Sequence, residues 1–176
     1  MTSPAVDGTS RVTVGRIVVM VLVVAMVTMW AYVLYLALGP GRQDPPDQLS
    51  DPTFSIAAEA RCRTSLEGIA TLPHAVDTPG AVERASVIVQ ANGFIEAMLD
   101  DLDRLAPGGE DGKLVRAWLA DWRTYLADRE AYASALRVDP SARLLVSPKD
   151  HAQVTEYLDA FAGDNHMPAC ATPLDV

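Results

Sequence analysis

One uninterrupted apolar run constrains this chain more than any other feature. Residues 17–38 read IVVMVLVVAMVTMWAYVLYLAL and contain no charged side chain and a single Thr. A helix of that length reaches roughly 33 Å at about 1.5 Å per residue, which is enough to cross the hydrocarbon core of a bilayer. A helix of a soluble protein rarely needs to be apolar on every face. We therefore predict a transmembrane helix over residues 13–38, in contact with the lipid bilayer through residues 17–38.

A cleaved signal peptide is the alternative interpretation of the same run. The run is longer than the roughly 7–15 apolar residues of a typical signal core. The segment from Ala37 to Gly41 offers a poor cleavage site, because Pro40 would follow the cut. No Cys precedes Cys62 to act as a lipoprotein acceptor. The sequence favours a retained signal-anchor.

The flanking charges predict the orientation of this helix. Arg11 and Arg16 precede the run, whereas Arg42 is the one basic residue that closely follows it. Positive charge is favoured on the cytoplasmic side of a membrane helix. We expect a single-pass plasma-membrane protein whose residues 1–12 are a cytoplasmic tail and whose C-terminal part is extracytoplasmic.

The segment after the apolar run differs sharply in composition. Residues 39–52 read GPGRQDPPDQLSDP and contain four prolines. Proline favours extended, semi-rigid chain over a packed core. We predict a Pro-rich stalk over residues 39–52 and an exported domain over residues 53–176.

The two cysteines are placed near the two ends of that exported domain. Cys62 and Cys170 are the only cysteines of the chain, and an even pair in an oxidising compartment predicts one disulfide. Closing a loop of about 100 residues stabilises by up to roughly 4.7 kcal/mol on the chain-entropy model. Two unrelated buried thiols are the alternative. A metal site is disfavoured, because neither cysteine belongs to a CxxC or CxxH cluster.

Charge limits the partners of the exported part. Beyond residue 40 the chain has 22 acidic and 12 basic residues, an excess of ten negative charges. Such an excess disfavours nucleic acid and anionic lipid headgroups as partners.

Helical patterns fill the exported domain. Three times a capping residue is followed by proline, which is a typical helix start, and apolar residues then recur at three- and four-residue spacing. The predicted helices begin at Asp51, Thr78, Glu110 or Asp111, and Ser147, and end near Leu72, Leu105, Leu136 to Val138, and Gly163. We expect an all-α protein: an N-terminal transmembrane helix followed by an exported bundle of three to four helices closed by one disulfide.

Chemistry-bearing motifs are scarce. The histidines His74, His151 and His166 form no HExxH or i, i+4 pair with another ligand type, and no GxSxG or SxxK is present. The acidic run Asp100, Asp101 and Asp103, with Glu96 a turn earlier, lacks the alternating ligands and central glycine of a calcium loop. We interpret it as a solvated helix face, whose negative charge is offset by Arg104 and by basic groups on the facing helix. The expectation is a protein that is not an enzyme and has no metal or other cofactor.

The stretch WLADWRTYLADREAY, residues 118–132, is the densest group of aromatic residues. On a heptad its large side chains fall on one continuous stripe, which predicts the core-facing or ligand-facing side of a helix. The stripe comprises Trp118, Trp122, Tyr125, Arg129 and Tyr132 together with Val115, Leu119, Leu126, Ala133 and Leu136.

Arg129 is the anomaly of the stripe, because it places a permanent cation among apolar residues. Such a side chain either reaches out to water or pairs with a carboxylate. Glu96 or the Asp100–Asp103 group on the preceding helix are the partners that the sequence suggests.

The order of these features resembles a group of uncharacterised actinobacterial single-pass envelope proteins with a helical exported domain. The resemblance rests on the anchor, the Pro-rich stalk, a helix with one Cys, the pattern WLxDWxxYxxDRxxYA over Trp118 to Ala133, and Met167-Pro168-Ala169-Cys170. It implies no catalytic residues and at most an accessory role in a membrane complex.

Two functions fit these features. The leading hypothesis is a membrane-anchored, non-enzymatic accessory or scaffold protein of the cell envelope, which binds other membrane or envelope proteins such as a transporter or respiratory assembly. The alternative is a small carrier of a lipophilic ligand, held between the helices near Trp118 and Trp122.

Overall fold

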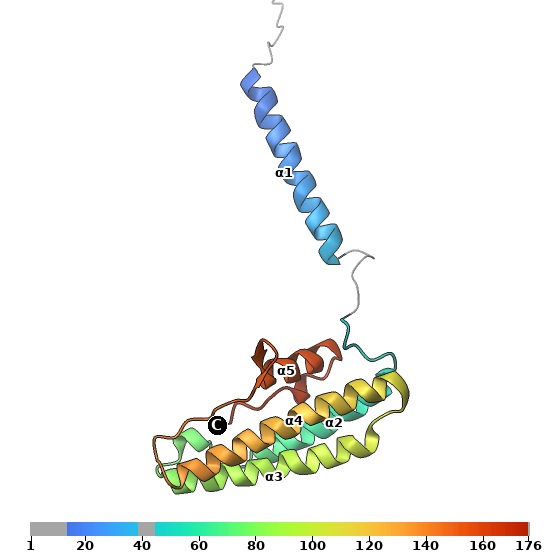
Figure 1. The fold of residues 1–176 in the computed structure, drawn as a ribbon. Helices are drawn as coiled ribbons and strands as arrows, with labels where there is room; N and C mark the ends of the chain where they lie inside the picture. Colours follow the sequence, from blue (N-terminus) through green and yellow to red (C-terminus); the bar gives the residue numbers. More distant parts are fainter. Residues whose placement is uncertain (1–13, 39–44, 176) are drawn as a thin grey trace, which may run out of the picture. The chain divides into compact units, whose positions relative to one another are not determined.

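The computed structural model describes residues 14–38 and 45–175 (Figure 1). The chain divides into two units, Met1–Asp44 and Pro45–Val176. The predicted tail, residues 1–12, and residues 39–44 of the predicted stalk lie outside the described residues.

Helix α1, Val14–Leu38, is the predicted apolar helix. Its window Val14–Ala37 has a mean hydropathy of 2.7 and buries none of its residues. Among the described residues it is the one helix long and apolar enough to cross a membrane. A helix of this kind near an N-terminus is either a membrane span or a signal sequence.

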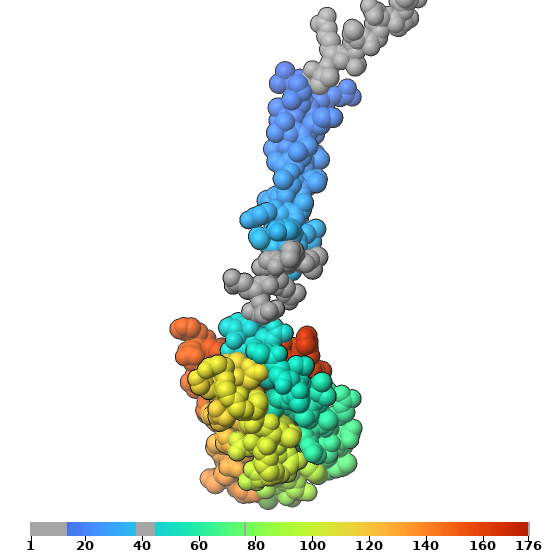
Figure 2. All heavy atoms as spheres, turned by 90° about the vertical axis from the view of Figure 1, so that its right-hand side faces the viewer, coloured from blue at the N-terminus to red at the C-terminus, as the bar shows by residue number. Residues whose placement is uncertain are grey.

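The second unit begins with a short segment that packs on the helices. Leu49 is buried, and its backbone N–H donates to Asn165 Oδ1 at 2.8 Å. The N–H groups of Ser50 and Asp51 donate to the carboxylate of Asp111, each at 3.1 Å. Figure 2 shows this first part of the unit, in cyan, against the start of α4, in yellow. Residues 45–51 therefore belong to the folded unit, although the sequence placed them in the stalk.

Helix α2, Pro52–Ile69, begins as the sequence predicts. Asp51 is its N-cap, and the Asp51 carboxylate accepts from the Thr53 N–H at 2.8 Å. The Thr53 hydroxyl donates to the same carboxylate, and the two hydrogen bonds together lower the pKa of Asp51.

Helix α3, Ala81–Leu105, starts later than the Thr78 cap predicts. Residues Ala75–Asp77 form the 3-10 turn η1, and the Thr78 hydroxyl donates to the carbonyl of His74 at 3.0 Å instead of capping a helix. Gly80 is the N-cap of α3. The hydroxyl that was expected to cap the helix is thus used by the preceding turn.

Helix α4, Gly109–Leu136, matches its predicted ends within two residues. Gly109 has φ of +68°, in the left-handed region where glycine has no steric penalty, so the chain can turn between α3 and α4 there. Helices α3 and α4 pack along their length as a hairpin, and α2 packs on α3 (Figure 1).

The segment after α4 corrects the predicted Ser147 helix start. Pro148–Lys149 and Ala152–Gln153 form a small antiparallel hairpin, β1 and β2, and helix α5 begins only at Val154 and ends at Asp164. Gln153 caps α5 through a capping box with Glu156. The Ser147 hydroxyl and N–H instead donate to Asp128 of α4 at 2.8 and 2.7 Å. The helical bundle therefore has four helices, α2 to α5, with the 3-10 turn η2, Pro168–Cys170, after them.

The buried apolar residues form two clusters. The larger cluster joins α2, α3, α4, α5 and η2, and includes Phe54, Trp118, Trp122 and Phe161. The smaller one contains Ala75, Ala85, Ile88, Ala133 and Leu136. The all-α prediction is confirmed for the described residues.

Candidate functional site

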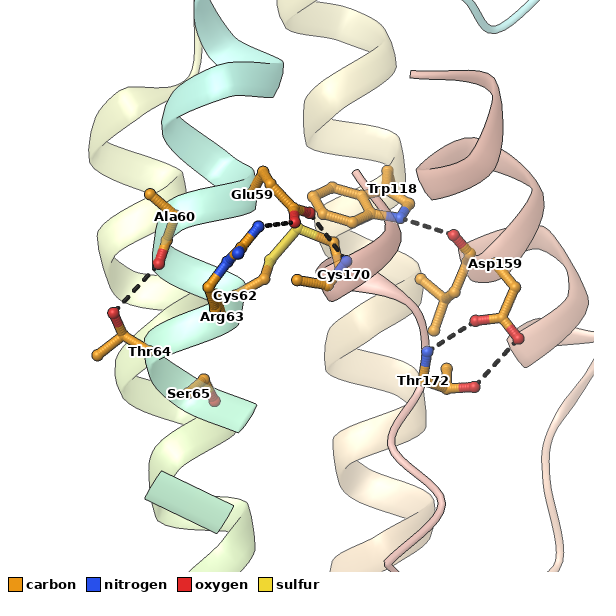
Figure 3. The surroundings of a disulfide bond; sticks show 12 residues. Glu59, Ala60, Cys62, Arg63, Thr64, Ser65, Trp118, Asp159, Cys170 and Thr172 are labelled. Carbon is orange, nitrogen blue, oxygen red and sulfur yellow. Dashed lines mark hydrogen bonds and ion pairs between the residues drawn. A yellow bond between two sulfur atoms is a disulfide. The ribbon is translucent and has the colours of Figure 1, made fainter. Parts of the chain in front are cut away.

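The disulfide joins η2 to the middle of α2. Cys62 and Cys170 are bonded, with their Cα atoms 5.0 Å apart, and both are fully buried. Next to the bond, Glu59 accepts from the Ala169 N–H at 2.8 Å and from Arg63 (Figure 3). The predicted disulfide is confirmed, and it fixes the chain that leads into the C-terminal tail.

The predicted stripe on α4 faces the interior. Trp118 and Trp122 are only 3% and 2% exposed, and Trp118 stacks on Phe161 with ring centroids 5.0 Å apart. The Trp118 indole N–H donates to the carbonyl of Leu158 at 3.3 Å. The two indole rings fill the region between the helices where the sequence suggested a ligand. Of the other stripe residues, Tyr132 is half-buried and the rest are buried, namely Val115, Leu119, Tyr125, Leu126, Arg129, Ala133 and Leu136.

Arg129 forms the centre of a buried polar layer. Its side chain is 0% exposed, and its two terminal nitrogens donate to the two carboxylate oxygens of Asp175 at 2.8 and 2.7 Å. Its Nε donates to Asn92 Oδ1 at 2.7 Å. The Tyr125 hydroxyl lies 3.5 Å from Nη1, and the Tyr125 ring centroid lies 5.6 Å from the guanidinium carbon. We call these four side chains, Asn92, Tyr125, Arg129 and Asp175, the Arg129 layer.

The partner of Arg129 differs from the prediction. Glu96 is exposed on α3, and the Asp100–Asp103 group pairs with arginines at the surface. Asp175 instead comes from the C-terminal tail, 46 residues along the chain. The prediction of a carboxylate partner holds, but the Glu96 and Asp100–Asp103 assignment is wrong, because those side chains point to water while the tail reaches the interior.

The layer shifts the pKa values of two of its members. Burial alone would lower the pKa of Arg129, but the hydrogen bonds and negative charge of Asp175 outweigh burial and raise it. Burial raises the pKa of the Tyr125 hydroxyl, and the nearby charge of Arg129 offsets only part of that increase. Arg129 therefore stays a cation, and Tyr125 stays neutral, over the physiological range.

The acidic run behaves as a solvated face. Asp101 pairs with Arg104 and lies 3.8 Å from Arg61 of α2, and Asp103 lies 3.3 Å from Arg123 of α4. The sequence expected basic groups on the facing helix, and Arg123 is one of them. Within residues 14–38 and 45–175, no three His, Cys, Asp or Glu side chains come together as a metal site.

Two aspartates of the repeated Leu-Ala-Asp have a role that sequence analysis missed. Asp128 accepts both hydrogen bonds from Ser147, and Asp121 pairs with Lys149 at 2.5 Å. Lys149 also lies 4.8 Å from the Tyr157 ring centroid. The heptad spacing of the two aspartates, off the apolar stripe, is the signal that would have identified a docking edge for the hairpin.

A pocket of about 230 Å³ opens beside the Arg129 layer. Apolar side chains of α2, of the segment that follows it and of α3 form most of its wall, and the tail residues Pro173, Leu174 and Asp175 line it as well. These apolar residues include Leu66, Ile69, Leu72, Val87 and Ala91.

The Arg129 layer can recognise an anion, but it is not suited to proton transfer. Arginine is effectively never deprotonated in proteins, whereas its planar fork binds a carboxylate through two parallel hydrogen bonds. Comparison with protein-family models, with characterised proteins and with solved structures finds no match to this chain.

Proposed function

We propose that this protein is a membrane-anchored, non-enzymatic accessory or scaffold protein of the bacterial cell envelope. The observation that carries the proposal is the pairing of one exposed apolar helix, α1, with a disulfide-closed helical unit. Disulfides persist in oxidising compartments, so the unit that holds Cys62 and Cys170 belongs on the exported side. The N-terminus is then cytoplasmic, in agreement with Arg11 and Arg16.

The exported unit is proposed to bind other membrane or envelope proteins, for example a transporter or respiratory assembly. Its buried aromatic residues, disulfide and docked hairpin support a rigid shape, which suits a scaffold because little ordering cost accompanies binding. The resemblance to actinobacterial single-pass envelope proteins points to the same role.

Orientation is tested by labelling engineered cysteines with a membrane-impermeant thiol reagent in intact cells. V138C lies at a position that is 87% exposed, and S3C is the matched position before α1; both are made in a C62A/C170A background. We expect V138C to be labelled in intact cells and S3C only after permeabilisation. The reverse pattern would refute the proposed topology, and release of the exported unit without α1 would indicate a cleaved signal sequence.

The scaffold role is tested by purifying the full chain in mild detergent after crosslinking in cells. We expect one second protein in constant stoichiometry, and the same protein when it is the bait. Recovery of this protein alone would count against the proposed function.

A further inference from the structure

We infer that Arg129, Asn92 and the adjoining pocket form a binding site for a small apolar monocarboxylate, and that Asp175 fills the charged end of this site from within the chain. The inference goes beyond the proposed scaffold role and does not depend on it.

The charged end of the site is already shaped for a carboxylate. Arg129 is fully buried and holds the two oxygens of Asp175 at 2.8 and 2.7 Å. A buried guanidinium needs such a partner, since it cannot lose its charge. Nothing in this geometry requires the carboxylate to belong to Asp175, so another carboxylate that reaches Arg129 satisfies the same two donors.

Asp175 is held by a weakly fastened segment. The tail after η2 is irregular, and Thr172 anchors it to Asp159 at 2.7 Å. After Thr172, the hydrogen bonds that hold the described part of the tail are the two that the Asp175 carboxylate accepts from Arg129. The side chain of Leu174 is 96% exposed. Asp175 can therefore leave Arg129 without unfolding a helix, provided that another carboxylate takes its place.

The pocket supplies the apolar end of the site. Asp175 contributes to its wall together with Pro173 and Leu174, and it also contacts Arg129. Movement of the Asp175 carboxylate therefore opens the pocket toward the cation, while the walls formed by α2, the segment after it and α3 stay in place. A volume of about 230 Å³ exceeds the roughly 150 Å³ of an apolar cavity that takes benzene. A single ring or a short alkyl chain therefore fits.

Asn92 provides a further donor. Its Oδ1 accepts from Arg129 at 2.7 Å, while its Nδ2 is buried and has no partner among the described residues. Asp175 leaves that donor unused. A free carboxylate, which no peptide tether restrains, has the freedom to accept from Nδ2 as well.

The test measures binding of hexanoate to the full chain in lipid nanodiscs. Binding is followed by titration calorimetry and by the NMR chemical shift of hexanoate that is isotope-labelled at its carboxyl carbon. Hexanol is the matched neutral probe, and acetate lacks the apolar chain. Because an internal competitor acts at about millimolar effective concentration, we expect Asp175→Ala to bind hexanoate at least about ten-fold more tightly than the wild type. Arg129→Met should bind no more than empty nanodiscs do.

Asp159→Ala is the second variant, for the case in which Asp175→Ala does not fold. It keeps Asp175 and every residue that lines the pocket, but it removes the carboxylate that anchors the tail at Thr172, so hexanoate binding should tighten about two-fold or more. Equal binding of hexanol, unchanged binding in Arg129→Met, or no gain in either Asp175→Ala or Asp159→Ala would overturn the inference. Binding of the free peptide Thr-Pro-Leu-Asp-Val without binding of hexanoate would also overturn it, in favour of a protein ligand.

Discussion

The two apolar clusters of the folded unit are closed in different ways. The larger cluster is covered by the disulfide between Cys62 and Cys170 and by the packed rings of Trp118 and Phe161. The smaller cluster contains only Ala, Ile and Leu side chains. The first has its own cross-link and several buried rings, whereas the second has no cross-link and only the half-buried ring of Tyr132 packed against it.

The Arg129 layer lies near the boundary between these clusters along both long helices. On α4, Arg129 follows Leu126 of the larger cluster and precedes Ala133 of the smaller one. On α3, the smaller cluster includes Ile88 and the larger one begins at Ala91, so Asn92 lies just past the boundary between them. The tail therefore supplies the counter-charge for a cation that is buried near the boundary between the two clusters.

Asp175→Ala should therefore have the largest effect. It leaves Arg129 buried without a counter-charge, and removal of one partner of a buried pair costs about 3–5 kcal/mol. Urea unfolding of the detergent-solubilised full chain measures this loss. Asp164→Ala, which removes a half-buried carboxylate outside the layer, is the control. A loss no larger than that of the control would show that the layer does not need the tail.

Removal of the disulfide should be the next largest effect. The double variant C62A/C170A loses a cross-link that spans 108 residues, and such a loss costs about 2–5 kcal/mol in the free energy of unfolding. Reducing agent should destabilise the wild type and leave the double variant unchanged. If the double variant unfolds at the wild-type urea midpoint, the aromatic packing alone closes the larger cluster.

The two tryptophans of the larger cluster differ in the hydrogen bonding of their indole N–H groups. The Trp118 N–H donates to Leu158, whereas the Trp122 N–H is buried and has no partner among the described residues. We expect Trp118→Phe to cost about 1 kcal/mol more than Trp122→Phe, because only the former loses a hydrogen bond. If both variants lose the same free energy of unfolding in urea, the hydrogen bond from Trp118 to Leu158 contributes nothing measurable to stability.

Tyr125 should give the smallest effect, which appears only at alkaline pH. Burial, partly offset by Arg129, raises its pKa above the ordinary value of 10.0, so the native state holds its proton at a pH where the unfolded chain has lost it. The stabilising contribution is then complete below about pH 10 and decreases as the pH rises through the native pKa. The free energy of unfolding should fall more steeply above pH 10 in the wild type than in Tyr125→Phe. If the free energy of unfolding falls equally steeply with pH in both proteins, the pKa of Tyr125 is not raised in the folded state.

Local patterns predicted most of the helices, and they predicted the residues that α4 contributes to the Arg129 layer. The Asp51 cap and the α4 stripe, with Arg129 on it, follow from local spacing, whereas the burial of Arg129 was one of two outcomes that the sequence left open. The disulfide followed from the number and placement of the cysteines.

The features that the sequence did not predict depend on distant or competing partners. Asp175 lies in an irregular tail, so no periodicity connects it to Arg129. Ser147 and Thr78 look like helix caps, but Asp128 and the carbonyl of His74 take their hydroxyl groups. Side-chain hydrogen bonds of this kind compete with helix capping, and only the folded chain determines which partner is used.

A double-mutant cycle between Arg129 and Asp175 measures how strongly the tail is coupled to the core. Arg129→Met keeps an apolar stem in the layer and leaves no buried cation, so the double variant should be more stable than Asp175→Ala alone. A coupling of at least about 2 kcal/mol in urea unfolding is the predicted result. Additive losses, with a coupling below about 0.5 kcal/mol, would contradict the account that the tail carboxylate completes the core.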